Sequence, residues 1–415
     1  MITKTSVSPA RAGGTLFSIL FAVSLVHLLN DTIQSVVPAI FPIVKESLQL
    51  SYTQLGLIAF ALNATASILQ PAIGFYSDSK PKPYLLPLGM AATLVGVLGL
   101  ALAGSFSVML LSVALVGIGS AVFHPESAKI AYMAAGQRRG LAQSIFQVGG
   151  STGQALAPIM TALIFVPLGQ FGIIWFTIAA AAAIAIQTYT ARWYSSQLRL
   201  RPAKRKLQQT APTTTGSRRQ VRFAVSILLL LVSTKMAYLA AITSFYSFYL
   251  IEHFQLPIGQ AQWIVFGFLF AGAVGTFFGG AIADLWGRRN MIWFSIIAAL
   301  PFALALPYVN VQLSVLFSII IGLTIMSSGS VTVVYAQELL PGKVGTVSGL
   351  FFGLSFGMGG LSAAALGMLA DATSIGFVIK LCALLPLLGL MTILLPSDTK
   401  LKQWSSQAEQ SQVNL

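Results

Sequence analysis

The chain has 415 residues, of which 56% are hydrophobic and only 8% are charged, and its formal net charge is +14. A soluble domain carries about 25% charged residues, so this composition excludes a soluble protein and indicates an integral membrane protein. The basic residues flank the apolar runs as short loops would, which argues against nucleic acid as a partner. The single cysteine, Cys382, cannot form an internal disulfide.

Apolar runs recur along almost the whole sequence, and each is close to the length of about 20 residues that crosses a bilayer as a helix. These runs are continuous, whereas the strands of an outer-membrane barrel alternate apolar and polar residues, so we expect an all-α membrane protein. The twelve predicted helices span residues 17–40, 52–76, 84–103, 107–135, 141–166, 171–194, 222–250, 258–283, 289–308, 312–338, 346–370 and 375–396.

A polar segment divides the predicted helices into six and six. It is rich in Arg, Lys, Pro, Thr, Gln and Ser, a composition that cannot bury a core. Most of the 24 Lys and Arg residues lie in this segment or in loops and tails on the same side, which predicts cytoplasmic termini. The predicted domains are a first half at 1–194, a cytoplasmic linker at 195–221, a second half at 222–396 and a cytoplasmic tail at 397–415.

The two halves contain matching stretches. A Gly-x-x-x-Asp pattern ends the second predicted helix at 74–78 and the eighth at 280–284, and residues 140–146 match 345–351 at nearly the same separation. Local matches at one spacing indicate a duplicated unit. Parallel six-helix repeats resemble the plan of the major facilitator superfamily, whose substrate site lies between the halves near the middle of the membrane. We therefore expect two six-helix halves around a central cavity.

The loop after the eighth predicted helix strengthens this resemblance. Its helix-ending carboxylate and the cations that follow resemble the gating-loop signature of the superfamily, whereas the first-half copy has Pro81 and Lys82 in place of a glycine and an arginine. A carboxylate there can bind an arginine or the positive end of a helix, and these contacts would break on opening. The predicted gating residues are Gly74, Asp78, Gly280, Asp284, Gly287, Arg288 and Arg289.

Polar side chains follow one face of the first predicted helix. The face holds His27, Asn30, Asp31 and Gln34. Spacings of three and four residues align such side chains, and we expect this stripe to face the central cavity. Asp31 lies too deep to reach bulk water easily, so we predict that it couples proton movement to a conformational change. The alternative is a structural carboxylate that is hydrogen-bonded to its neighbours.

The fourth predicted helix carries three charged or titratable residues around Pro125. Glu126 and Lys129 are three residues apart and can pair on one face. His124 points about 200° away from Glu126 unless Pro125 distorts the turn. The pair is either a structural ion pair or one that exchanges for a proton during transport, and the sequence leaves both possibilities open. His124 is a candidate for titration and for substrate contact.

Two further helices contribute candidate residues. The seventh carries Lys235 well inside its apolar run, with Tyr238 on roughly the same face, and we expect them to form a wall suited to an anion. The fifth places Gln147 on a polar face, next to a small-residue face that contains Gly149 and Gly153. Small residues at every fourth position allow close contact between helices, so we expect this second face to serve packing.

Four stretches of the first half resemble the bacterial fosmidomycin resistance proteins. These stretches are residues 27–35, 69–74, 120–127 and 140–150. The resembled proteins are inner-membrane members of the major facilitator superfamily. The resemblance therefore implies a proton-coupled antiporter of the bacterial inner (cytoplasmic) membrane that exports a small anionic antibiotic such as fosmidomycin. The second half resembles them mainly in its layout and in the gating-loop signature.

With this resemblance, we expect a monomer in the lipid bilayer that works by alternating access on protons and a small anionic, drug-like substrate. We expect no cofactor, no metal and no nucleic acid. The candidate proton-coupling residues are Asp31, Glu126 and His124. The candidate substrate-binding residues are His124, Lys129, Lys235, Asn30, Gln34, Gln147 and Tyr238.

Other functions remain as alternatives. An importer of an organic anion or a sugar phosphate could use the same fold, because the motifs do not determine the direction of transport. A transporter-like membrane sensor is less favoured, since the sequence has no soluble output domain. We also predict that the chain is not an enzyme, because a metal cluster or a Cys/His pair would require His27, His124, His253 or Cys382 to converge from distant parts of the sequence.

Overall fold

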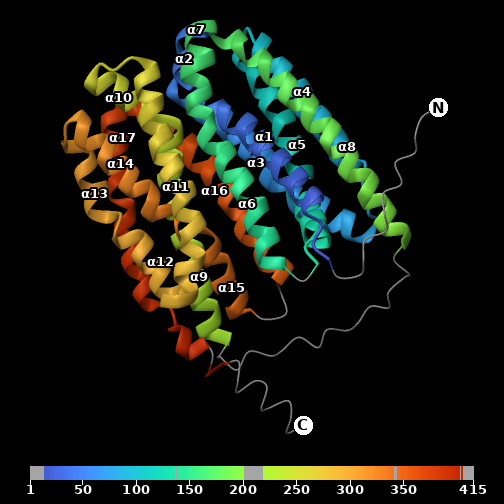
Figure 1. Ribbon diagram of the computed structural model, residues 1–415. Coiled ribbons are helices and arrows are strands. Elements are labelled where there is room, and N and C mark those ends of the chain that lie inside the picture. Colours follow the sequence, from blue (N-terminus) through green and yellow to red (C-terminus); the bar gives the residue numbers. More distant parts are fainter. Residues whose placement is uncertain (1–13, 137, 201–217, 341–343, 402, 405–415) are drawn as a thin grey trace.

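The computed structural model describes residues 14–136, 138–200, 218–340, 344–401 and 403–404 (Figure 1). Regular secondary structure within these ranges is entirely helical. The first half contains α1 (Phe17–Ala39), α2 (Phe41–Ser47), α3 (Tyr52–Ser79), α4 (Leu85–Leu102), α5 (Phe106–Ala134), α6 (Arg139–Met160), the π-helical turn η1 (Thr161–Phe165), α7 (Val166–Leu168), the 3-10 helix η2 (Gln170–Trp175) and α8 (Phe176–Leu200).

The second half begins with α9 (Arg218–Ala241), the π-helical turn η3 (Ile242–Tyr246), α10 (Ser247–Phe254), α11 (Ile258–Trp286) and α12 (Arg288–Ile297). It continues with α13 (Leu300–Ala305), the 3-10 helix η4 (Leu306–Tyr308), α14 (Val311–Met326), α15 (Gly329–Leu339), α16 (Val344–Ala372), α17 (Ile375–Ala383) and the 3-10 helix η5 (Leu385–Leu394). Within the described ranges, 11 helical segments are long and apolar enough to cross a membrane, and Leu85–Ala101 is a shorter apolar helix. This set is consistent with the twelve predicted spans.

Several predicted spans are interrupted rather than straight. The predicted helix at 141–166 comprises α6, η1 and α7, and Pro158 lies just before the π-helical turn. Proline lacks a backbone donor, which interrupts the regular hydrogen-bond ladder at such a position. The predicted helix at 375–396 is α-helical only to Ala383 and continues as the 3-10 helix η5. Sequence periodicity alone does not reveal these changes of helix type.

The structure describes part of the predicted linker and part of the predicted tail. Helix α8 continues to Leu200, so residues 195–200 of the predicted linker are helical, and 201–217 lie outside the described residues. In the predicted tail, Asp398 accepts hydrogen bonds from the backbone N–H groups of Arg288 at 3.2 Å and Arg289 at 3.3 Å. Part of the tail therefore packs on the second half, because it supplies an acceptor for free N–H groups at the start of α12.

The two halves pack against each other through small residues. Figure 1 shows the blue-to-green helices on one side of the bundle and most of the yellow-to-red helices on the other, and α16 packs along α3 while α11 packs along α6. A Cβ atom added to Gly56 of α3 would lie 2.4 Å from the carbonyl oxygen of Ala363 in α16. Only glycine permits two helix backbones to approach this closely.

We use the name far end for the end of the bundle that lies opposite Leu16 and Leu395. At the far end, Asp371 of α16 accepts hydrogen bonds from the backbone N–H groups of Tyr52 at 2.9 Å and Thr53 at 2.7 Å. Near the same end, the side chain of Gln262 donates to the carbonyl oxygen of Ala39 at 3.0 Å. These hydrogen bonds join the two halves at the far end.

Candidate functional site

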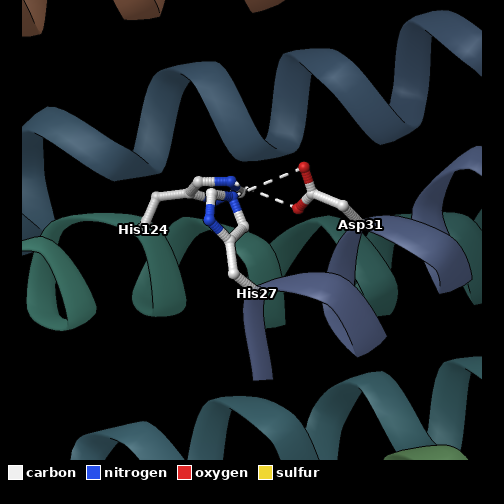
Figure 2. Close-up of side chains that lie close together, drawn as sticks. All are labelled: His27, Asp31 and His124. Carbon is white, nitrogen blue, oxygen red and sulfur yellow. Dashed lines mark ion pairs between the residues drawn. The ribbon is translucent and has the colours of Figure 1, made fainter. Parts of the chain in front are cut away.

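The first polar cluster lies where α1 meets α5. Asp31 stands between two imidazoles: His27 Nε2 lies 3.5 Å from Asp31 Oδ2, and His124 Nε2 lies 3.5 Å from Asp31 Oδ1 (Figure 2). The side chains of His27 and Asp31 are 5% and 6% exposed, whereas that of His124 is 18% exposed. We call these three residues the His–Asp–His cluster. His124 is the member of the cluster that is most exposed to solvent.

Backbone carbonyl groups orient both imidazoles of the His–Asp–His cluster. His27 Nδ1 lies 2.8 Å from the carbonyl oxygen of Phe146, and His124 Nδ1 lies 3.0 Å from that of Ser120. A carbonyl oxygen can only accept, so each Nδ1 carries the hydrogen and each Nε2 is the atom turned towards Asp31. In the neutral form of each imidazole, Nε2 carries a lone pair that faces the negative carboxylate of Asp31. The two groups repel each other unless a proton or another cation lies between them.

Amide donors hold the carboxylate of Asp31. Asn30 Nδ2 donates to Asp31 Oδ1 at 3.0 Å, and Gln154 Nε2 of α6 donates to Asp31 Oδ2 at 3.0 Å. His27, Asn30 and Asp31 are 4%, 1% and 4% exposed. In this structure these three residues are therefore buried rather than open to a cavity. They are packed against α5 and α6, because those helices supply the partners that a buried carboxylate requires.

The second cluster joins α5 to α3. Lys129 Nζ lies 3.0 Å from Glu126 Oε1, and it also donates to Ser77 Oγ. The side chain of Glu126 is fully buried, and that of Lys129 is 26% exposed. The phase of the helix predicted this separation, since Glu126 pairs with Lys129 while His124 faces Asp31. One helix thus contributes to two distinct clusters.

The third cluster lies within the second half. Lys235 Nζ donates to Ser328 Oγ, which is 2.7 Å from Ser295 Oγ of α12. Ser328 occupies the break between α14 and α15. Tyr238 is 2% exposed and belongs to the apolar core. The predicted wall of one cation and aromatic side chains is therefore split: Lys235 is held by hydroxyl groups, and Tyr238 is packed among apolar residues.

The remaining candidate residues take separate positions. Gln34 of α1 and Gln147 of α6 are half-buried. In the gating loop, Arg288 lies 3.7 Å from the carboxylate of Asp284 and also pairs with Glu338 of α15. Asp284 has 73% of its side chain exposed. Gly74 and Gly280 lie within the last two turns of α3 and α11, and Gly287 lies between α11 and α12. The side chain of Arg289 donates to the carbonyl oxygen of Ile393 at 2.7 Å. The side chain of Asp78 lies outside the described residues.

Three contacts of the His–Asp–His cluster were missed by the sequence-based prediction. His27 was assigned to the polar stripe but not to the site, and neither Gln154 nor Phe356 was assigned to the site. The ring of Phe356, from the second half, lies 5.6 Å from the ring of His124. The spacing of His27 and Asp31 was a usable signal, whereas the contact with Phe356 depends on the packing of α16. The cluster thus borders the other half of the protein.

The long apolar helices indicate a multi-pass membrane protein, and the family comparison assigns it to the transporters. The family model of the Major Facilitator Superfamily matches residues 23–364 and 236–414. A crystal structure of a mutant of the nucleoside transporter NupG superposes with a TM-score of 0.71 at 14% identity, covering 90% of this chain and 99% of that one. A bacterial homologue of the human lysosomal transporter Spinster, inward-facing and unoccupied, superposes with a TM-score of 0.70 at 18% identity, covering 94% and 93%.

Two relatives narrow the classification. The fosmidomycin resistance protein of Escherichia coli (strain K12) is 50% identical over 384 residues, covering 92% of this chain and 94% of the relative. The uncharacterized MFS-type transporter YfnC of Bacillus subtilis (strain 168) is 48% identical over 396 residues, covering 95% and 97%. The chain belongs to the fosmidomycin resistance family of the major facilitator superfamily.

Proposed function

We propose that this protein exports a small anionic antibiotic of the fosmidomycin type in exchange for protons. The observation that carries this proposal is a Glu126–Lys129 ion pair and a buried Asp31 between two histidines, inside apolar helices of a chain that is 50% identical to a fosmidomycin resistance protein. Charges inside a bilayer are costly, and they mark substrate and proton pathways in transporters. The direction of transport and the nature of the driving ion are part of the proposal.

The Glu126–Lys129 pair supports an anionic substrate. Lys129 is partly exposed, so an incoming anion could bind its ammonium group while Glu126 takes up a proton and releases its partner. Loss of that proton would restore the ion pair and expel the anion. Lys235 offers a second cation from the other half. Asn30, Gln34, Gln147 and Tyr238 remain proposed contacts for the substrate.

The His–Asp–His cluster supports coupling to the movement of the halves. A change in the protonation of Asp31 or His124 alters the charge of a site that is nearly closed to water, where electrostatic energies are large. His124 touches Phe356 of the second half, so a shift of its ring reaches that half directly. We therefore propose Asp31, His124 and Glu126 as the proton-coupling residues of an alternating-access cycle.

The setting of the protein belongs to the same proposal. We place it as a monomer in the bacterial inner membrane with both termini in the cytoplasm. The excess of Lys and Arg in the loops and tails on one side supports this orientation, since cytoplasmic loops are enriched in these residues. Alkaline phosphatase fused after residue 415 should be inactive, whereas fusion in the loop at 48–51 should give activity. The reverse pattern would overturn the orientation.

Uptake of radiolabelled fosmidomycin into inverted membrane vesicles tests the proposed transport. With a proton gradient imposed (vesicle interior acidic), vesicles containing the protein should accumulate the drug, and Asp31→Asn should abolish the gradient-dependent part. His253→Ala is the matched control, because this histidine lies at the far end and stacks on Tyr249 at 5.1 Å between ring centroids. Accumulation that is unchanged in Asp31→Asn would reject the proton role of Asp31, and drug movement only in the opposite direction would favour the importer.

A further inference from the structure

We propose that the His–Asp–His cluster is a binding site for a divalent transition-metal ion, with Zn²⁺ as the best-fitting occupant. The ligands are His27 Nε2, His124 Nε2 and the carboxylate of Asp31, and the potential ligand atoms all lie within 4.8 Å of one another. The sequence predicted no metal, since the ligands come from α1 and α5, which are far apart in the chain. This inference goes beyond the proposed transport function and does not depend on it.

The distances within the cluster suit a metal better than direct hydrogen bonds. A charged N–H group bonded to a carboxylate lies about 2.7 to 2.9 Å from the oxygen. Here each Nε2 lies 3.5 Å from its nearest Asp31 oxygen. Zn²⁺ binds imidazole nitrogen at about 2.0 to 2.1 Å and carboxylate oxygen at about 2.0 to 2.2 Å, so the edge of a tetrahedron around it is about 3.3 to 3.5 Å. Both Nε2–oxygen separations are close to that edge, and each involves a different oxygen of Asp31.

The surroundings of the cluster are those of a metal site. A metal-binding histidine characteristically donates its second ring N–H to a backbone carbonyl or a carboxylate, which fixes the tautomer. His27 does so to Phe146 and His124 to Ser120, at 2.8 and 3.0 Å. Amide donors from two helices likewise anchor both oxygens of Asp31. All three ligands are therefore held before a metal arrives.

A glycine lets α6 lie close against these ligands. Gly150 of α6 faces the cluster, and a Cβ atom there would lie 2.5 Å from His27 Nε2 and 3.0 Å from Asp31 Oδ2. Among the described residues, Asn30 Oδ1 is buried and accepts no hydrogen bond. Because its amide nitrogen binds Asp31, it is a suitable acceptor for a water molecule in the fourth coordination position. The 18% exposure of His124 provides an entry path.

The ligand set selects the class of metal. Two imidazoles and one carboxylate suit Zn²⁺, Co²⁺, Ni²⁺ and Cu²⁺, whereas Mg²⁺ and Ca²⁺ prefer oxygen ligands. Metal binding requires unprotonated Nε2 atoms, so it competes with protons for the same lone pairs. If these protons drive transport, Zn²⁺ is also an inhibitor of it.

Zinc binding to the purified full-length protein tests the site without any transport. The protein carries a tag without histidine, is dialysed in detergent against Zn²⁺, and its metal content is measured by mass spectrometry. One Zn²⁺ per chain is expected, with affinity reduced at least tenfold in His27→Ala, His124→Ala and Gly150→Ala. His253→Ala is the matched histidine control and should retain full affinity. Visible d–d bands of added Co²⁺ should report tetrahedral coordination in the wild type and in His253→Ala.

The outcomes of this test are distinct. Failure of the wild type to bind Zn²⁺, or equal affinity in the wild type and His124→Ala, overturns the site. If His253→Ala loses Zn²⁺ binding while His27→Ala retains it, the metal binds elsewhere and the proposed site is likewise overturned. Size-exclusion profiles establish that each variant is folded, and His124→Gln replaces His124→Ala if the latter aggregates. Proton-coupled transport by a protein that binds no Zn²⁺ would reject only this inference.

Discussion

Replacing Gly153 with alanine tests the packing that builds the His–Asp–His cluster. Its Cβ atom would lie 2.3 Å from the carbonyl oxygen of Leu28, about 1 Å short of van der Waals contact, and the obstacle is helix backbone. Helices α1 and α6 must therefore separate. Overpacking of this kind costs about 1 to 3 kcal/mol, and the better helix propensity of alanine offsets up to about 1 kcal/mol. The separation also stretches the bond from Gln154 to Asp31.

Gly359→Ala is the matched control for this prediction. Gly359 also lies inside a long helix, but a Cβ atom there would meet nothing within 4 Å, so only the propensity gain applies. We expect the unfolding free energy of Gly153→Ala to be lower than that of Gly359→Ala by about 1 to 3 kcal/mol. Thermal unfolding in detergent should show a midpoint lower by a few degrees. Equal midpoints for the two variants would refute the close contact between α1 and α6.

Three further substitutions test other contacts. Lys129→Met leaves the fully buried Glu126 without its ion-pair partner and should destabilise the protein by about 3 to 5 kcal/mol. A thermal midpoint equal to that of the wild type would contradict the pairing. The double variant with Glu126→Gln should regain part of the lost stability. Asp398→Ala removes an acceptor for the first N–H groups of α12 and should cost about 0.5 to 2 kcal/mol, seen as faster hydrogen exchange confined to that turn. Asp371→Ala should speed exchange at Tyr52 by removing its acceptor, and unchanged exchange would mean that the contact between the halves is not formed in the membrane.

The length and phase of the helices were accessible from the sequence. Continuous apolar runs predicted the spans, because backbone groups in lipid must be satisfied within a helix. Spacings of three and four residues placed His27 on the same face as Asp31, and they paired Glu126 with Lys129. The small-residue face of α6 was correctly predicted to serve packing, since Gly153 lies against the backbone of α1. Local periodicity is sufficient for each of these features.

Contacts between helices were not accessible in the same way. Nothing in the spacing of α1 shows that His124 of α5 approaches Asp31, because that contact depends on which helices pack together and at what rotation. The contact of Phe356 with His124 also depends on helix packing. Ser328 can bind Lys235 because it lies in the break between α14 and α15. The burial of Tyr238 follows from the tertiary core rather than from its helical face.

Exchange of drug for protons in a system that contains only this protein is the most direct test of the central claim. Proteoliposomes carrying a pH-sensitive dye in the lumen should report proton movement when fosmidomycin is added on one side, in the direction opposite to the drug. Asp31→Asn should lose the signal and His253→Ala should keep it. Fosmidomycin flux with no accompanying proton movement in the wild type would contradict proton-coupled export.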